Sequence, residues 1–319
     1  MLRLCLAGAC LFLAALPDLG AQSAESCKLC HPAIYDEWKE SMHAKAWVDP
    51  IYQRFLDTRA KQGLEVESCK PCHIPQPILR TGVGQMPKVR EEDLDEGVTC
   101  VTCHQGEEAA YHGPFVAKAD TEALQLVHGS VEDKRFLTHE ICASCHGIKE
   151  VPAHDQLTTY LETPLRGEGV SCQQCHMPYV ERPAGRQDLY PTLEDRPSGM
   201  HSWPGSSVLD QLKQAFEYET GKDNGAFVLG VKNNAGHAVP PTYGRVLVFE
   251  VTFLSGETTL STESVELSME SGKRLEPLAW NYYELPLPEG ADRVRVRTLH
   301  RRMPFLDAEL VGEHAAGLE

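Results

Sequence analysis

Five short cysteine–histidine motifs constrain this chain of 319 residues more than any other feature. In each motif, two residues separate a pair of cysteines, and a histidine follows the second cysteine directly. C-x-x-C-H is the attachment signature of c-type haem. On a helical turn, residues i, i+3 and i+4 share one face, so both thiols reach one porphyrin while the imidazole points at its iron. The sequence therefore predicts five covalently attached haems c, held by Cys27, Cys30 and His31; Cys69, Cys72 and His73; Cys100, Cys103 and His104; Cys142, Cys145 and His146; and Cys172, Cys175 and His176.

Paired cysteines have two other common uses in proteins. C-x-x-C pairs also form tetrahedral zinc sites, and they act as redox dithiols. Neither use requires a histidine directly after the second cysteine, whereas all five pairs have one. The set as a whole therefore favours haem attachment over zinc or dithiol chemistry.

The first residues have the layout of a secretory signal peptide. Arg3 precedes an apolar run at residues 4–16, then Pro17 and several small residues follow. This run is short for a bilayer span, so a cleaved signal over residues 1–24 is favoured over a retained anchor. Cys5 and Cys10 lie in this segment, so every cysteine of the predicted mature chain belongs to a haem motif. Export places the protein in the periplasm or outside the cell.

The charge balance bears on the partners. The formal net charge is −16, and haem propionates would make it more negative. Such a surface argues against nucleic acid and favours redox protein partners with basic or charge-complementary docking surfaces. The alternative is that the acidity only keeps an exported protein soluble. No segment after the predicted signal is apolar enough to span a membrane.

The motifs divide the chain into two predicted domains. All five lie between residues 27 and 176, and residues 25–224 are expected to form a pentahaem domain of helices and loops with a haem-packed core. The strings Glu96–Cys100 and Glu168–Cys172 are similar, which suggests an internal duplication. Residues 74–92 and 179–204 are rich in proline and glycine and are expected to be loops. Helices are expected at residues 33–48, 120–127, 132–143, 155–161 and 206–218.

From residue 225 the pattern changes from helical to extended. Short alternating or β-branched segments are separated by turn residues such as Gly256 and Gly290. Residues 225–319 are therefore expected to form a small antiparallel β-sandwich. Its strands are predicted at residues 226–232, 245–253, 263–269, 279–283 and 293–298.

The sixth ligand of each iron decides what the haems can do. Of 14 histidines, five follow the motif cysteines, which leaves nine. His139 stands three residues before Cys142, so it can serve only a haem other than the one held by His146. His300 and His314 are expected to be exposed. The predicted distal ligands are His43, His128, His139, His201 and His237, with His112 and His154 in reserve.

Several strings resemble one group of proteins. Y-x-x-W-x-x-S-x-H-A begins at Tyr35, G-V-[ST]-C-x-x-C-H occurs at the third and fifth motifs, and C-x-x-C-H-M-P ends at Pro178. A G-H-x-x-P loop contains His237, with one or two residues inserted before Gly244. The chain resembles the multihaem cytochrome superfamily that includes the tetrahaem electron acceptor of hydroxylamine oxidoreductase and the octahaem tetrathionate reductases. The resemblance implies that His43 and His237, and more loosely His201, match distal-ligand positions.

Three functions remain open on the sequence. Bis-histidine ligation closes iron to substrates, and the histidine supply is sufficient for closed irons, so an electron-transfer protein is favoured. The second is a reductase acting on a small nitrogen or sulfur oxyanion at one open haem. No C-x-x-C-K motif marks such a haem, and no catalytic residue is predicted. The third is a protomer of a homo-oligomer or extracellular cytochrome filament.

Overall fold

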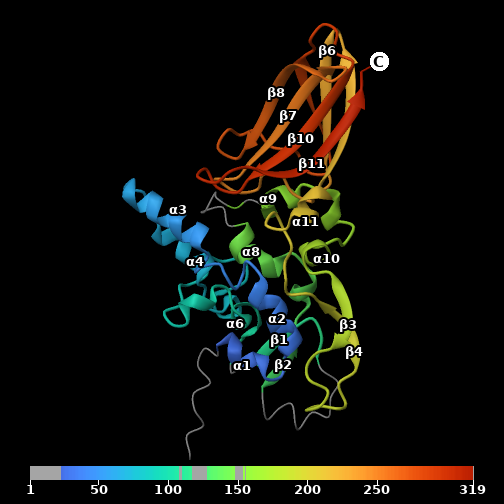
Figure 1. Cartoon of the computed structure of the whole chain (residues 1–319). Helices are drawn as coiled ribbons and strands as arrows, with labels where there is room; N and C mark the ends of the chain where they lie inside the picture. Colours follow the sequence, from blue (N-terminus) through green and yellow to red (C-terminus); the bar gives the residue numbers. More distant parts are fainter. Residues whose placement is uncertain (1–22, 108–109, 117–127, 148–153, 155, 319) are drawn as a thin grey trace, which may run out of the picture.

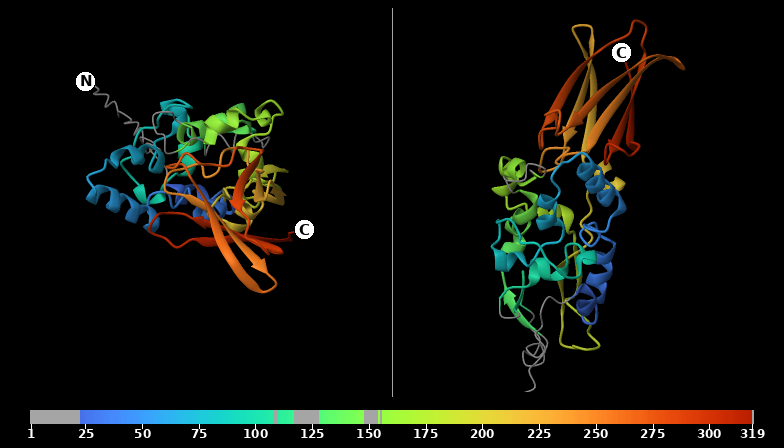
Figure 2. Two further views of the ribbon diagram at one scale, coloured as in Figure 1. Left: turned by 90° about the horizontal axis from the view of Figure 1, so that it is seen from above. Right: turned by 90° about the vertical axis from the view of Figure 1, so that its left-hand side faces the viewer.

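The computed structural model describes residues 23–107, 110–116, 128–147, 154 and 156–318. The predicted signal peptide at residues 1–24 and the predicted helix at residues 120–127 lie outside these ranges, apart from residues 23 and 24. The described chain has two parts (Figure 1). Helices and loops form one part, and a β-sandwich lies at one end of it. The two turned views in Figure 2 show the same stacking.

The helical part consists of short elements. Four helices end at the histidine of a motif, so the attachment sequences themselves are the regular structure here. The α-helices are α1 (Ala24–Lys28), α2 (Pro32–Glu40), α3 (Pro50–Lys61), α4 (Lys70–His73), α5 (Ile78–Thr81), α6 (Cys100–His104), α8 (Glu140–His146), α9 (Gln156–Leu161), α10 (Cys172–His176) and α11 (Leu209–Lys213). The 3₁₀ turns are η1 (Glu67–Cys69), η2 (Leu94–Glu96), η3 (Lys134–Leu137) and η4 (Pro164–Arg166).

Several helix predictions were wrong in extent. The helix expected at residues 33–48 ends at Glu40, because Ser41 is extended with ψ 161° and the chain then continues as turns. The segment 132–143 divides into the end of a strand, η3 and the start of α8. Only α9 follows its prediction closely. Helix α3 was not expected, although Asp49 caps it by accepting from the Tyr52 amide, and Pro50 occupies its first turn.

The β-sandwich is built from two antiparallel sheets. One has the order β11-β10-β7-β8 and the other β5-β6-β9. Phe227, Leu229 and Val231 from one sheet and Phe249 and Val296 from the other belong to one buried cluster, which is the core between the layers. Its strands are β5 (Phe216–Asp223), β6 (Ala226–Asn233), β7 (Val246–Ser255), β8 (Thr258–Ser268), β9 (Trp280–Pro286), β10 (Arg293–Arg301) and β11 (Glu309–Gly317).

All five predicted strands are present and each is longer than expected, although β7 and β9 begin one residue later and β8 ends one residue earlier than predicted. Two strands were missed. The predicted helix at residues 206–218 was wrong at its end, because Phe216 begins β5 and pairs with Asn233 of β6. The sheet therefore begins before residue 225. Strand β11 (ELVGEHAAG) has no regular alternation of apolar and polar residues, and it joins the edge of the sheet by pairing with β10.

Two small sheets lie outside the sandwich. Strands β1 (Ala110–Gly113) and β2 (Gly129–Glu132) pair in parallel. Strands β3 (Tyr179–Pro183) and β4 (Asp195–Gly199) pair antiparallel, so the loop predicted at residues 179–204 contains a hairpin. Figure 1 shows both sheets at the end of the helical part remote from the sandwich. Among the described residues, no helix is both long and apolar enough to cross a bilayer.

Candidate haem-binding site

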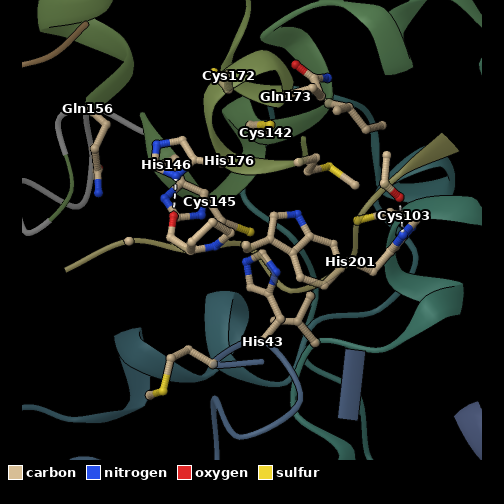
Figure 3. A pocket seen from close by; sticks show the side chains of 18 of the residues that line it. His43, Cys103, Cys142, Cys145, His146, Gln156, Cys172, Gln173, His176 and His201 are labelled. Carbon is tan, nitrogen blue, oxygen red and sulfur yellow. Dashed lines mark hydrogen bonds between the residues drawn. The ribbon is translucent and has the colours of Figure 1, made fainter. Parts of the chain in front are cut away.

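One cavity of about 1830 Å³ runs through the helical part and reaches the sandwich. All fifteen motif residues line it, although they come from segments spread over 150 residues of sequence. Figure 3 shows His43, His146, His176 and His201 gathered in this space from separate segments. The remaining predicted ligands and reserves also line it: His112, His128, His139, His154 and His237. This donor set of paired thiols and imidazoles around a shared apolar space fits covalently attached haem.

The motif histidines are oriented by backbone carbonyls. The Nδ1 atoms of His31, His73, His104 and His176 lie 2.6 to 2.7 Å from carbonyl oxygens. An Nδ1–H that donates to a carbonyl fixes the tautomer and leaves Nε2 free to bind a metal. The acceptors belong to Ala184, Ala46, His112 and Pro204 respectively.

Two imidazoles on opposite faces of one haem have a characteristic separation. A histidine nitrogen binds a transition metal at about 2.0 Å, and the ring centre lies roughly 1 Å behind it, so two axial ring centres are roughly 6 Å apart. Four motif histidines have another histidine at this separation. The pairs are His31 and His128 at 6.3 Å, His104 and His201 at 6.1 Å, His176 and His237 at 6.4 Å, and His43 and His146 at 6.2 Å.

The fourth motif has a second neighbour. His154 lies 6.3 Å from His146, almost the same separation as His43. An iron held by His146 has one further axial position, so only one of these two imidazoles can fill it. The Nδ1 atom of His154 is buried, and within the described ranges it has no hydrogen-bond partner.

The second motif differs from the other four. Within the described chain, no histidine ring lies at the axial separation from His73. Instead the Tyr52 ring stacks on the His73 imidazole, with ring centres 3.9 Å apart and an interplanar angle of 4°. Burial raises the pKa of the Tyr52 hydroxyl far above its usual range. The proximal imidazole here is thus held by a ring stack and by the Ala46 carbonyl.

Two candidates lie away from any axial partner. The ring contact of His139 is with Tyr160 at 5.5 Å. The backbone carbonyl oxygen of His112 accepts a hydrogen bond from the His104 imidazole. The Nδ1 atom of His112 lies 3.1 Å from a carboxylate oxygen of Asp133. These contacts do not support His139 as a distal ligand, and its assignment stays a prediction.

Comparison with known proteins gives a family match over part of the chain and a solved structure of similar fold. A family model described as cytochrome c554 and c-prime matches residues 26–106. The chain is similar to a penta-haem cytochrome c552 from Thermochromatium tepidum, with 20% identity and a TM-score of 0.67 over 93% of this chain and 99% of that one. A hypothetical protein from Pyrococcus horikoshii OT3, at 13% identity over 33% of this chain and 88% of its own, has a TM-score of 0.23 and carries no argument. No curated protein matches. The findings support a multihaem c-type cytochrome.

In this chain, the tryptophan and serine of the Y-x-x-W-x-x-S-x-H-A string position His43. Trp38 is buried and its indole N–H donates to the Val98 carbonyl at 2.8 Å. Ser41 is buried and its hydroxyl accepts from the Ala44 amide at 3.2 Å, which closes the turn that carries His43. The Val98 amide in turn donates to the His43 carbonyl at 2.9 Å. This segment is therefore anchored to the residues just before the third motif.

The same segment requires glycine at position 97. Gly97 has φ +58°, and a Cβ there would lie 2.5 Å from the His43 carbonyl oxygen and 2.8 Å from the Ala44 oxygen. Gly169 is the equivalent residue before the fifth motif and has φ +74°, but a Cβ there would meet nothing within 4 Å. The two strings thus share a glycine with positive φ, whereas, of these two glycines, only Gly97 is closely approached by a second backbone segment.

His201 is positioned by a half-buried ion pair that the sequence did not reveal. The carboxylate of Glu37 on α2 pairs with Arg182 on β3, at 2.5 and 2.9 Å, and accepts from the His201 amide at 2.9 Å. Burial acts to raise the pKa of Glu37, but the hydrogen bonds from Arg182 and His201 outweigh it and lower that pKa. Glu37 and Arg182 are 145 residues apart, so no local pattern could have joined them.

His237 is held between the sandwich and α9. The buried Asn233 side chain donates to the His237 carbonyl at 2.9 Å, and the Ala238 amide donates to the Thr159 hydroxyl at 3.0 Å. A Cβ on Gly236 would lie 2.7 Å from a methyl group of Leu165. The G-H-x-x-P loop therefore packs closely against the helical part, and this packing brings His237 to the fifth motif.

Burial keeps the cavity imidazoles neutral. It lowers the pKa of His43, His154 and His201 to about 3 and that of His146 to about 4. In each case burial is the main cause and neighbouring imidazoles add to it. Neutral imidazole is the form that binds a metal.

Thiol contacts order the attachment sites in space. Hydrogen bonds join Cys27 to Cys100, Cys72 to Cys145 and Cys142 to Cys172. The first motif therefore adjoins the third, and the fourth adjoins both the second and the fifth. Cys103 lies within electrostatic range of Cys142 and Cys145, which connects the third motif to the fourth.

Proposed function

We propose that this chain is an exported pentahaem electron carrier in which at least four irons are closed by a second histidine. The observation that carries the proposal is the set of four imidazole pairs at the axial separation, each containing one motif histidine. The matches to cytochrome c554 and c-prime and to a penta-haem cytochrome support a haem-based electron-transfer role.

The residues assigned to the haems follow from the pairs. Bound haem supplies an iron that takes up and releases one electron at a time. His31, His104, His146 and His176 hold one face of their irons, and His128, His201, His43 and His237 hold the other. The cysteines of each motif fix the porphyrin covalently, which prevents loss of the cofactor and fixes its orientation. An imidazole on each face of an iron would keep it low in spin and closed to substrates.

The thiol contacts support a connected route. Sites one, three, four and five follow one another, and site two joins at site four. An electron entering at one end of the helical part can thus reach the region under the sandwich without leaving the protein. Given the net charge of −16, the partners proposed are redox proteins with basic docking surfaces.

A second function is favoured by one observation. Among the described residues, His73 has no imidazole at the axial separation, so the iron at the second motif has an open face in this arrangement. An open iron binds small molecules, and the second candidate is a reductase acting on a small nitrogen or sulfur oxyanion there. The remaining four sites would then supply its electrons.

Haem counting and carbon monoxide titration separate these functions. The pyridine haemochrome assay should give five haems per chain, and fewer would contradict the proposal. A ferric spectrum with no high-spin component and no carbon monoxide binding by the reduced protein indicates a carrier with five closed irons. One carbon monoxide per chain, together with reoxidation of the reduced protein by nitrite or tetrathionate, indicates the reductase. Binding of two or more would overturn the assignment of the four pairs.

A further inference from the structure

Two arginines lie side by side where the sandwich meets the cavity. Arg245 directly precedes β7 and Arg302 directly follows β10, and the register pairs their neighbours Val246 and Arg301. Both arginines line the cavity, together with Thr242 and Met303. The backbone of His154 pairs with that of Thr242, so these arginines adjoin the segment that approaches His146.

The positive charge here exceeds the negative charge. Arg302 forms an ion pair with Glu309 at 3.0 Å. For Arg245, by contrast, the described part of the chain offers neither an ion pair nor a hydrogen bond. Glu270 lies nearby but accepts from the Gly244 amide instead. Burial, and then the charge of Arg302, lower the pKa of Arg245.

The two histidines near this arginine pair, His154 and His300, are uncharged. His300 is 4% exposed, and the Nδ1 atoms of His300 and His154 are both buried, with no hydrogen-bond partner among the described residues. Burial and then Arg245 hold the pKa of His300 at about 4, so it is neutral. Arg245 lines the cavity without an ion-pair partner among the described residues, and Arg302 beside it adds a second positive charge, so a counter-charge from within the cavity would stabilise both.

We propose that Arg245 and Arg302 bind the carboxylate of a haem propionate, from the haem at the second or the fourth motif. A guanidinium presents two parallel N–H groups that match a carboxylate, and each haem brings two such carboxylates into the cavity. The second and fourth motifs are the ones concerned, because His154 lies within electrostatic range of both His73 and His146. The inference rests on the proposed haem content. With this contact the sandwich does more than supply His237, because Arg245 and Arg302 at the ends of β7 and β10 place positive charge near a haem.

The test is spectropotentiometry of the haem-loaded protein in chloride buffer. Loss of a positive charge favours ferric iron. Arg245→Gln should therefore shift the redox equilibrium of one haem at least tenfold toward the ferric form, which lowers its potential by about 59 mV. Arg245→Lys keeps the charge and should change that equilibrium less than threefold. Arg293→Gln removes an exposed arginine at the start of β10, at the other end of the strand, and should change nothing. A haem count of five for each variant shows that it is folded and loaded.

Each outcome bears on one part of the inference. A count below five in the unaltered protein refutes the proposed function rather than this site. Five haems with no potential changed by Arg245→Gln overturns the propionate assignment. A free oxyanion as the ligand would appear as a spectral or potential change on adding nitrite or inorganic phosphate to the unaltered protein, lost in Arg245→Gln, and that too overturns propionate binding. A shift in chloride buffer that added anions do not alter supports it.

Discussion

Replacing Gly97 by alanine tests whether the approach of two backbone segments positions His43. The φ angle of +58° is strained for any residue with a Cβ, and this Cβ would also lie 2.5 Å from the His43 oxygen, 2.8 Å from the Ala44 oxygen and 2.9 Å from the Ala46 nitrogen. None of these atoms is the end of a flexible side chain. The substitution therefore pushes the His43 segment away from the residues before the third motif.

The magnitude follows from two contributions. Gly97 has φ +58° and ψ −122°, a backbone region outside the left-handed helical one that costs a residue with a Cβ about 1–3 kcal/mol. Overpacking against backbone adds about 1–3 kcal/mol. The expected destabilisation is thus about 2–6 kcal/mol, or a lowering of Tm by roughly 4–24 °C for a chain of this size. Because the displaced segment carries His43 and also Ala46, whose carbonyl orients His73, a new high-spin ferric signal from one haem should accompany it.

Gly169→Ala is the matched control. Its φ of +74° is also positive and also disfavours a side chain, but no atom lies within 4 Å of the added Cβ. This variant should lose about 1 kcal/mol and keep the unaltered spectrum. Thermal unfolding followed by circular dichroism, with electron paramagnetic resonance for spin state, measures both effects. Equal losses of stability in the two variants, with no spectral change in Gly97→Ala, would refute the reasoning.

Three further predictions concern other contacts. His43→Ala should make the haem at the fourth motif high-spin, whereas His154→Ala should leave it low-spin; the reverse result in electron paramagnetic resonance would exchange the two assignments. Glu37→Gln removes the carboxylate charge beneath His201 and should cost about 2 kcal/mol in unfolding free energy and broaden the low-spin signal of one haem. His300 is neutral when folded, with a pKa of about 4 against an ordinary value near 6.5, so the unfolded chain binds the extra proton and stability falls as pH drops from 6.5 to 4. The loss should reach about 3 kcal/mol, and His300→Gln should flatten the urea-unfolding profile across that range; an unchanged slope would contradict this account.

Local spacing was informative where the chemistry itself is local. A C-x-x-C-H string needs one helical turn, and four of the five motifs form or end such turns. The strands of the sandwich were also predictable, because alternation along a strand directly reflects burial on one face. The same argument failed for β11, because this edge strand lacks regular alternation, although it pairs with β10 and buries Val311. The argument from periodicity failed for β5 because the short helix α11 ends at Lys213 and the strand begins only three residues later, at Phe216.

The sequence by itself predicted the kind of cofactor and the residues that would attach it, and it determined the supply of imidazoles available for closing the irons. Only the tertiary structure decided which imidazoles approach which motif histidines. His176 and His237 are 61 positions apart and face each other because the sandwich loop packs on α9. His73 has no such partner within the described chain, although the sequence treats it like the other four. Axial pairing depends on distances between segments remote in sequence, and no periodicity within one segment encodes them.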